Sequence, residues 1–535
     1  MKVDRPHEFC DGMDISETLR NAVDKCCKFK TGKIILPRGK YIFKDEKSIR
    51  DFKNLMIGNI NPDTKWGRCG IPFNRAVSFK NCDNLVIDGQ GSTIIFEGLI
   101  QPFEFINCSN VLIKNISIDW NRPMFSEGRV LNNENDTIKA KIFDNYFING
   151  GEPVWSFQDY DPATRRFGAF CPFCRGTSME LIAPQVVRFK FPDSGRVQIG
   201  SYLMFRHIGN YRPALYFFNC TNVNVENVTI NANPGMGIIG HSSKDFIFRK
   251  LKVIPRDERI MSVNTDAAHF ISCTGTIDFE DCYFQGMGDD AVNVHSFYFS
   301  VKKRFDDRTI LATIEAVTQD CLFDSPSAGD CVEFIRRDTL LPYASGKIKF
   351  VETDPEDWSC TIRFSQPLPE SFDNTDLISN VSRTAKLRFV RCLVKNIRAR
   401  GLLIQTRGVI VKDCAFDHCA GTGIHIDTAT GWFESMGARD IVIRDNRFIG
   451  CGYGPGTYKR TSGISVLTEC EIPVAGVHRN ITIKNNYIKG PGDTGIYISC
   501  TDGAVICKNN IEEVKNAIKI QYSNNIKLYE NRTDR

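Results

Sequence analysis

A short alternating pattern of apolar and polar residues recurs along most of the chain from Asn81 onward. Each copy opens on an Asn-rich or charged turn and continues into a strand-like run. The copies are NCDNLVIDGQGSTIIF, NCSNVLIKNISIDW, NCTNVNVENVTI, ARDIVIRDNRF, HRNITIKNNYI and SNNIKLYENR. Alternation with period two is typical of a β-strand with one buried face. A strand phrase that returns at intervals indicates a solenoid of stacked coils.

Small residues that open one strand of each coil give the length of the repeat. They are Ala214, Gly237, Ala267, Ala291, Gly401, Gly423, Gly463, Gly495 and Ala517. Five of the eight intervals between them are 22 to 30 residues, which suits a coil of three strands. We therefore predict an all-β chain folded as a right-handed parallel β-helix. The inward positions are expected to be Ala268, Val292, Leu402, Ile424, Ile464 and Ile496.

The repeat is interrupted twice, and its first coil is preceded by a different pattern. The segments expected are an N-terminal cap with the first coils (1–126), a first insert (127–210), middle coils (211–296), a second insert (297–384) and C-terminal coils (385–535). Both inserts have the pattern of antiparallel β-strands, and we expect them to pack together as one barrel-like subdomain. The run from Asp14 to Glu17 resembles a capping box that opens an amphipathic helix through Cys26. GKIILPRGKYIF then predicts two short strands around a turn.

The same register aligns polar side chains on the outer face. The column just before the small residue contains Asp266, Asp290, Arg400, Thr422, Ser462 and Thr494. The column two places after it contains His269, Asn293, Leu403, His425, Ser465 and Tyr497. The column four places after it contains Ile271, His295, Gln405, Asp427 and Leu467. Because neighbouring strands lie about 4.8 Å apart, Asp266 and Asp290 should stack, with Asp289 beside them. Like charges so close should raise the pKa of at least one carboxyl group.

This groove of carboxylates, imidazoles, amides and one arginine suits a carbohydrate, and Trp432 offers an aromatic face for a sugar ring. Hydrolysis of a glycosidic bond needs one carboxylic acid and one carboxylate. We expect Asp289 to be the acid, and Asp266 with Asp290 to hold and deprotonate a water molecule. Such an arrangement predicts inversion, with acid and base about 6.5 to 9.5 Å apart. The residues expected to bind the sugar are Asn264, His269, Asn293, His295, Arg400, His425 and Trp432.

Each of these residues also has a structural alternative. An outward aspartate at a turn caps backbone N–H groups or is solvated, and three of them together suit a calcium ion. Arg400 could serve solely to neutralise the charge of the aspartates, and Trp432 could belong to the core. At the level of function, the alternatives are a β-helical polysaccharide hydrolase of other specificity, a lyase that uses calcium and an arginine or lysine base, and a noncatalytic glycan-binding β-helix.

Composition excludes several other classes of function. The net charge of +5 is scattered over 535 residues, which does not predict binding to nucleic acid. No apolar run is long enough to predict a membrane span. The first residues do not resemble an export signal, so the expected compartment is the cytoplasm, or outside it if a leader was removed. A homodimer is left open. Many of the 21 cysteines recur at one place in the repeat and are expected to be buried thiols, and Cys171 with Cys174 forms a lone C-x-x-C.

Two motifs carry a resemblance to known families. N-T-D at Asn264 to Asp266, followed by G-D-D at Gly288 to Asp290, resembles β-helical glycosidases of the polygalacturonase type. Those glycosidases also carry Gly-His-Gly and Arg-Ile-Lys motifs, and this chain has neither at the corresponding position. We therefore do not expect it to prefer uronic acids.

The chain resembles glycoside hydrolase family 110 more closely, the α-1,3-galactosidases that act on blood-group-B-type glycans. The resemblance rests on GKIILPRGKYIF, SIDWNRPMFSEGRV, VNTDAAHF, GMGDDAVNVHS and the positions of both inserts. It implies an inverting exo-galactosidase without a metal or other cofactor, with Asp289 as acid and with Asp266 and Asp290 as bases.

Overall fold

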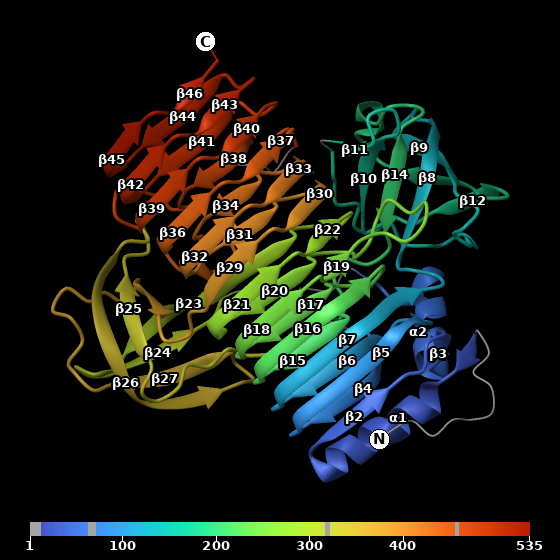
Figure 1. Cartoon of the computed structure of the whole chain (residues 1–535), viewed down its shortest axis with the longest axis horizontal. Helices are drawn as coiled ribbons and strands as arrows, with labels where there is room; N and C mark the ends of the chain where they lie inside the picture. The colour runs from blue at the N-terminus through green and yellow to red at the C-terminus, as the bar shows by residue number, and fades with distance from the viewer. Residues whose placement is uncertain (1–11, 63–70, 169, 316–321, 455–459, 535) are drawn as a thin grey trace.

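The chain winds into a right-handed parallel β-helix, as the repeat predicts (Figure 1). The computed structural model describes residues 12–62, 71–168, 170–315, 322–454 and 460–534. In Figure 1 the coils stack from the N-terminal end, in blue, to the C-terminal end, in red, so that chain order and spatial order agree along the axis. No helix in these ranges is long and apolar enough to cross a membrane.

One strand of each coil belongs to a parallel ladder that carries the polar columns. In order of pairing, its strands are β4 (Arg75–Lys80), β6 (Gln101–Ile106), β15 (Leu215–Phe218), β17 (Ile238–His241), β20 (Ala268–Ile271), β23 (Val292–Arg304), β31 (Leu402–Ile404), β34 (Ile424–Ile426), β38 (Thr461–Val466), β41 (Thr494–Ser499) and β44 (Asn516–Gln521). We call this ladder the site sheet.

The other strands of the coils form a second, larger parallel sheet. They are β1 (Met13–Asp14), β2 (Gly32–Ile35), β3 (Lys40–Phe43), β5 (Asp83–Phe96), β7 (Ser109–Trp120), β16 (Thr221–Ile230), β18 (Lys244–Arg249), β19 (Lys252–Val253), β21 (Thr274–Glu280), β22 (Tyr283–Gln285), β29 (Lys386–Val390), β30 (Leu393–Ile397), β32 (Arg407–Lys412), β33 (Ala415–Cys419), β36 (Arg439–Arg444), β37 (Arg447–Ile449), β39 (His478–Lys484), β40 (Tyr487–Lys489), β42 (Thr501–Cys507), β43 (Asn510–Glu512), β45 (Asn524–Tyr529) and β46 (Arg532–Thr533).

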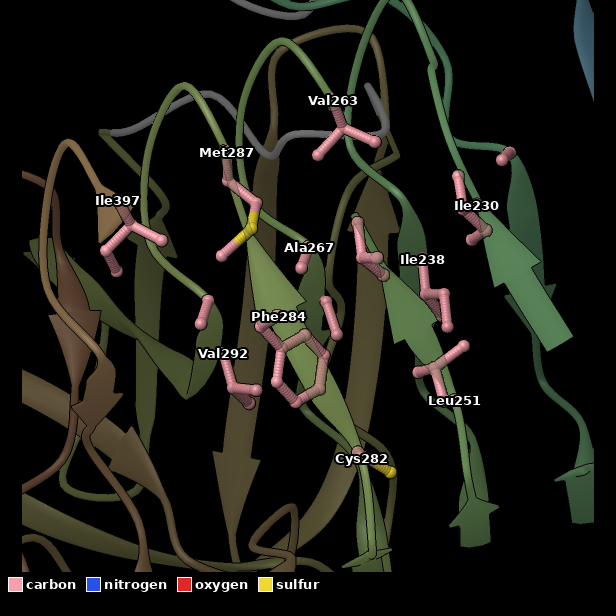
Figure 2. Packing of buried hydrophobic residues seen from close by; sticks show 14 of the residues in the cluster. Ile230, Ile238, Leu251, Val263, Ala267, Cys282, Phe284, Met287, Val292 and Ile397 are labelled. Atoms are coloured by element: carbon pink, nitrogen blue, oxygen red, sulfur yellow. The ribbon is translucent and has the colours of Figure 1, made fainter. Parts of the chain in front are cut away.

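The interior of the helix is a continuous apolar core. The predicted inward positions are fully buried and paired in register, as Ala268 is with Val292 and Val292 with Leu402. Figure 2 shows Ile238, Phe284 and Val292 among the side chains that fill this interior. Because each coil covers the apolar face of the next, stacking stabilises the strand pairing between neighbouring coils.

The recurring Asn-Cys turns have a physical explanation in the structure. Asn81, Asn107 and Asn219 adopt positive φ angles, which asparagine tolerates better than most residues. Their side chains hydrogen-bond from coil to coil, with the Asn219 amide donating to the Asn107 oxygen at 2.8 Å. The cysteines that follow, among them Cys82 and Cys108, are buried free thiols, as predicted.

The N-terminal end is covered by helix α1 (Ser16–Phe29), which packs on β2 and β4. Leu19, Val23 and Cys26 are buried there, as the sequence predicts. The capping box does not form, because the Asp14 carboxylate accepts hydrogen bonds from Ser16 instead. A second helix, α2 (Glu46–Met56), was not predicted; its N-cap Asp45 accepts from the Ser48 backbone N–H at 2.8 Å.

The two inserts are antiparallel, but they form separate bodies instead of the single expected subdomain. The first insert is a seven-stranded sheet of β8 (Phe125–Asn132), β9 (Thr137–Ile142), β10 (Ser156–Asp161), β11 (Arg166–Phe167), β12 (Glu180–Ala183), β13 (Val186–Lys190) and β14 (Tyr202–Arg206), with a short 3-10 turn at Ser194–Arg196. The second continues from β23 into β24 (Thr309–Thr313), β25 (Cys331–Ile335), β26 (Pro342–Asp354), β27 (Ser359–Phe364) and β28 (Leu377–Asn380), and β35 (Glu434–Ser435) pairs with β23 beside it. In Figure 1 the first insert, in teal, and the second, in yellow, lie on opposite sides of the helix.

Candidate active site

The candidate site lies where three successive turns lead into the site sheet. Asp266 precedes β20, Asp289 and Asp290 precede β23, and Arg400 precedes β31. Each turn is anchored by an apolar residue three places before the column of Asp266, Asp290 and Arg400. These residues, Val263, Met287 and Ile397, are fully buried and lie on neighbouring loops in Figure 2. The core therefore fixes the positions of the polar residues that follow.

Gly288 is required by the close approach of two of these turns. A Cβ atom at this position would lie 2.0 Å from the backbone oxygen of Asn264. Only a residue without a side chain allows the coils to come this close. The glycine of the G-D-D motif is thus explained by packing, and it brings Asp289 and Asp290 against the turn that carries Asp266.

The three aspartates converge as the register predicts. One carboxylate oxygen of each lies within 4.8 Å of those of the other two. Their exposure differs sharply: the side chain of Asp289 is 33% exposed, whereas that of Asp266 is 7% and that of Asp290 is 2%. Asp289 is therefore the member of the triad that is open to an incoming ligand.

Each carboxylate has its own basic partner. Asp290 forms a two-pronged ion pair with Arg400, at 2.9 Å from Nε and 2.7 Å from Nη2, and also accepts from the Arg400 backbone N–H. Asp289 accepts from Arg398 Nη1 at 2.9 Å. Asp266 contacts His269 Nδ1 at 2.7 Å and accepts from the Asp290 backbone N–H at 3.1 Å.

Burial shifts the titration of the two enclosed carboxyl groups. It raises the pKa of Asp266 well above its usual range, and the charge of Asp289 raises it further. Burial also raises the pKa of Asp290 to about 6, although the Arg400 guanidinium opposes this shift. Perturbed carboxyl groups of this kind are concentrated at functional sites.

The raised pKa of Asp290 has a consequence for stability. Because its folded pKa of about 6 exceeds the unfolded value, the folded state binds more protons between these two values. The free energy of unfolding should therefore fall as the pH rises from about 4 to about 6, with a contribution from this group on the order of 3 kcal/mol. Urea denaturation at stepped pH measures this, and Asp290→Asn should flatten the slope. An unchanged slope in the variant would contradict the assignment.

The outer face of the site sheet follows the predicted columns. His269 pairs in register with Asn293, Asn293 with Leu403, and Leu403 with His425. The imidazoles of His269 and His295 meet through their Nε2 atoms at 2.7 Å. These columns are buried, although outward residues of a β-helix commonly face solvent, because the second insert and the segment around β35 lie beside them.

Several buried polar atoms on this face have no hydrogen-bond partner among the described residues. They are Asn293 Oδ1, Gln405 Oε1, Thr422 Oγ1, His425 Nδ1 and Ser465 Oγ. An unsatisfied buried polar group costs about 1 to 3 kcal/mol, so five on one face need an explanation. All five belong to the predicted polar columns, and a ligand rich in hydroxyl groups would satisfy them.

Two of the residues expected to bind sugar have different surroundings. Asn264 is fully buried, and its amide donates to the backbone oxygens of Ile208 at 3.1 Å and Met124 at 3.4 Å, so it links the turn to the segments that flank the first insert. Trp432 is 57% exposed and lies two residues before Glu434, so it does not belong to the core. Sugar binding by either residue stays a prediction.

The structure adds residues that the sequence patterns did not single out. Glu434, on β35, approaches His295 at 3.7 Å and accepts from the Gln405 amide. Arg398 pairs with Asp289, and its Nε donates to Cys171 Sγ at 2.9 Å. The guanidinium of Arg206, at the end of β14, donates to the Asn264 backbone oxygen at 2.9 Å. Cys171 and Arg206 belong to the first insert, which therefore supports the catalytic turns.

Two clusters of the described residues bring potential ligands of a cation together. They are the three aspartates and the group of His269, His295 and Glu434. The imidazole Nε2 atoms are 2.7 Å apart, which fits a hydrogen bond and is closer than the about 3.3 Å that two nitrogens on one tetrahedral zinc ion would keep. The aspartates already pair with arginine or histidine side chains. Both clusters fit ion-paired and hydrogen-bonded groups better than ligands of an ion.

A separate cleft of about 1680 Å³ lies between the first insert and the coils of β22, β30 and β33. Its lining includes Glu127, Tyr160, Arg256 and Lys395, and none of the three aspartates. The large cleft and the acidic cluster are thus different features of the molecule, and the candidate site is the acidic cluster.

The chain is similar to several known proteins. A family model described as periplasmic copper-binding protein (NosD) matches residues 374–533, the C-terminal coils. The exopolygalacturonase from Thermotoga maritima aligns over 99% of this chain and 91% of its own, with 15% sequence identity and a TM-score of 0.46.

Curated relatives align over most of the chain. Alpha-1,3-galactosidase A of Bacteroides fragilis is 26% identical over 520 residues, which are 92% of this chain and 84% of the relative. Alpha-1,3-galactosidase B of Parabacteroides distasonis is 27% identical over 549 residues, which are 95% of this chain and 87% of the relative. The resemblance to α-1,3-galactosidases that the sequence motifs carry is therefore confirmed, and this chain is their homologue over most of its length.

Proposed function

We propose that this protein is a glycoside hydrolase that releases a terminal α-linked galactose from a glycan, with an α-1,3 linkage as its preferred target and with inversion at the anomeric carbon. The observation that carries the proposal is the position of the three aspartates at one end of a buried polar face. The names of the homologues supply the sugar and the linkage. The hydroxyl, amide and imidazole atoms on that face that lack hydrogen-bond partners among the described residues suit a sugar ring, which carries several hydroxyl groups.

Enclosure favours a terminal sugar over the interior of a chain. The atoms that lack partners are fully buried, so a ligand that reaches them is surrounded by protein. A terminal sugar can enter an enclosed site end-on, whereas the interior of a long polysaccharide needs an open groove. The exposed indole of Trp432 offers a surface for the sugar that follows the cleaved bond.

The roles of the aspartates follow from their exposure and partners. Asp289 is the general acid, because it alone is open enough to reach the leaving oxygen, and Arg398 positions it. Asp266 and Asp290 hold the attacking water on the opposite face of the ring. Both are fixed by hydrogen bonds on the protein side, which suits a group that positions water better than one that must attack carbon.

The spacing of the carboxylates is shorter than the separation of acid and base predicted from the sequence. Their nearest oxygens lie within 4.8 Å, below the about 6.5 to 9.5 Å of most inverting enzymes and near the about 5 to 5.5 Å of retaining ones. We propose inversion for two reasons. The paired Asp266 and Asp290 can share one water molecule, and the resemblance to glycoside hydrolase family 110 implies an inverting enzyme. The stereochemistry of the product decides between the two outcomes.

A panel of substrates tests the function directly. Nitrophenyl α- and β-glycosides are followed by a blood-group-B-type trisaccharide, and we expect turnover of the α-galactoside and release of galactose from the trisaccharide. A uronic acid oligomer should not be cleaved. Turnover of another glycoside in place of the α-galactoside would overturn the proposed specificity, and absence of turnover on all of them would favour a noncatalytic glycan-binding protein.

Asp290 sets an expected pH dependence of the reaction. A base must be ionised to accept a proton, and the pKa of Asp290 is about 6 in the free protein. We therefore expect kcat/KM to fall as the pH drops below about 6, by about tenfold for each further pH unit. Initial rates at low substrate concentration between pH 4 and 8 measure this limb. A flat profile down to pH 4 would show that no group with this pKa is the base.

Removal of divalent cations separates hydrolysis from the lyase alternative. A lyase that stabilises its intermediate with calcium loses activity in a chelator. The aspartates here pair with Arg398, Arg400 and His269, so we expect full activity after dialysis against a chelator. Loss of activity that added calcium restores would favour the lyase, and an unsaturated product would establish it.

A further inference from the structure

A line of three hydrogen bonds runs from Asp266 into the protein. Asp266 Oδ2 lies 2.7 Å from His269 Nδ1, His269 Nε2 lies 2.7 Å from His295 Nε2, and His295 Nδ1 lies 2.8 Å from the backbone oxygen of Ser296. Both imidazoles are buried. Each ring nitrogen of the two imidazoles takes part in one of these three bonds, so the protons that the bonds need can be counted.

Three hydrogen bonds need three protons. The Ser296 carbonyl oxygen can only accept, so the bond at that end uses a proton on His295 Nδ1. Two neutral imidazoles carry one proton each, which leaves one bond without a proton. The line is complete only when a further proton is present, either on the Asp266 carboxyl group or on one of the imidazoles.

The charges around the line agree with this count. Arg398 and Arg400 pair with Asp289 and Asp290, whereas the side chain paired with Asp266 is the imidazole of His269, so an ionised Asp266 has no guanidinium partner of its own. Asp266 would be the unbalanced buried charge, which proteins avoid. One proton in the line with His269 and His295 neutralises it.

Other charged groups lie around the line and affect its titration. Glu434 lies 3.7 Å from His295 Nε2, the charges of Asp289 and Glu434 raise the pKa of Asp266, and that of Arg400 lowers it. Burial lowers the pKa of His295 to about 4, although the charges of Glu434 and of Asp324, which belongs to the second insert, oppose this shift. A neutral His295 leaves its Nε2 as acceptor, so His269 Nε2 is the donor.

We propose that Asp266, His269 and His295 share one proton at neutral pH, in addition to the proton that each neutral imidazole carries. His269 and His295 are then positioning residues that keep Asp266 neutral, while Asp290 alone acts as the base. The second part rests on the proposed function. In that reaction the water oxygen bonds to the anomeric carbon and gives its proton to Asp290, while the glycosidic bond breaks and its oxygen takes the proton of Asp289. The shared proton stays in place.

The shared proton can be observed without any substrate. The chain has 8 histidines, so ¹⁵N-histidine labelling gives few NMR signals, and His269→Asn and His295→Asn identify the two of interest. At pH 7 we expect a proton on His269 Nε2 and on His295 Nδ1. The proposal is overturned if the Nε2 atoms of both residues are unprotonated, because the middle bond then has no proton.

The positioning role is tested by the pH dependence of turnover. In His269→Asn the amide donates to Asp266 and favours its ionised form. The ratio of the variant's kcat/KM to that of the parent should therefore be at least about tenfold lower at pH 8 than at pH 5.5. A merely structural defect would lower it equally at both. His418→Asn, which removes an imidazole paired with Asp417, should leave the profile unchanged. An equal loss at both pH values overturns the role, and if no glycoside is cleaved the NMR result still decides the shared proton.

Discussion

Asp289→Asn is expected to lower kcat on a galactosyl oligosaccharide by about 10²- to 10⁴-fold, because the amide cannot protonate the leaving oxygen. The loss should be smaller for a nitrophenyl galactoside, whose leaving group needs little help from an acid. Steady-state rates on both substrates measure this difference. The free energy of unfolding should change by less than about 1 kcal/mol, since the side chain is 33% exposed and the amide oxygen can still accept from Arg398.

Asp281→Asn is the matched control for this substitution. Asp281 also lies in a turn and pairs with an arginine, Arg391, but it belongs to the solvated side of the coil. We expect this variant to keep the parent rate. Turnover by Asp289→Asn at close to the parent rate on the oligosaccharide would remove Asp289 from the mechanism.

Arg400→Met is expected to abolish turnover and to lower the free energy of unfolding by about 3 to 5 kcal/mol, the usual cost of leaving a buried charge without its partner. Asp290, 2% exposed, would lose both side-chain hydrogen bonds from the guanidinium. The loss of stability should shrink as the pH falls, because a protonated Asp290 carries no charge. Denaturation at pH 7 and at pH 4.5 measures both effects.

Two further variants separate the ion pair from general packing. Arg388→Met removes an arginine from the exposed pair with Asp278 and should cost less than about 1 kcal/mol. Combining Arg400→Met with Asp290→Asn should restore most of the stability but none of the activity. If the double variant is no more stable than Arg400→Met, the uncompensated charge of Asp290 is not the cause of the loss.

Most of the fold could be predicted because the coil repeats. Each small residue fixes the register of one strand, and period two then assigns the next side chains inward or outward. The pairing of Ala268 with Val292 and of His269 with Asn293 follows from this rule alone. The convergence of Asp266 with Asp290 follows as well, since neighbouring coils hold equivalent residues at the spacing of the strands.

The inserts could not be placed in this way. Their strands alternate, but nothing in alternation says against which surface a sheet docks, and the two segments form separate sheets on opposite sides of the helix. Arg206 and Cys171 therefore reach the site from a body whose position no repeat determines. For the same reason the burial of the polar columns was not foreseen.

The remaining residues of the site escaped the sequence patterns for local reasons. Glu434 belongs to no column, because the segment of β35 leaves the coil and pairs antiparallel with β23. Arg398 lies two places before Arg400, in a turn where side-chain direction does not follow the strand period. A cation near three stacked carboxylates was nevertheless to be expected on electrostatic grounds, and the IRARG run at residues 397–401 offered two arginines for it.

The most direct test is proton NMR of the first sugar released from a blood-group-B-type trisaccharide, recorded before mutarotation. Galactose should be the sugar released, and it should appear first as the β-anomer, because water held by Asp290 attacks the face opposite the α-linkage. Release of the α-anomer would contradict the proposed use of Asp266 and Asp290 and indicate a covalent intermediate. Absence of any free galactose would contradict the assignment of the three aspartates as a galactosidase site.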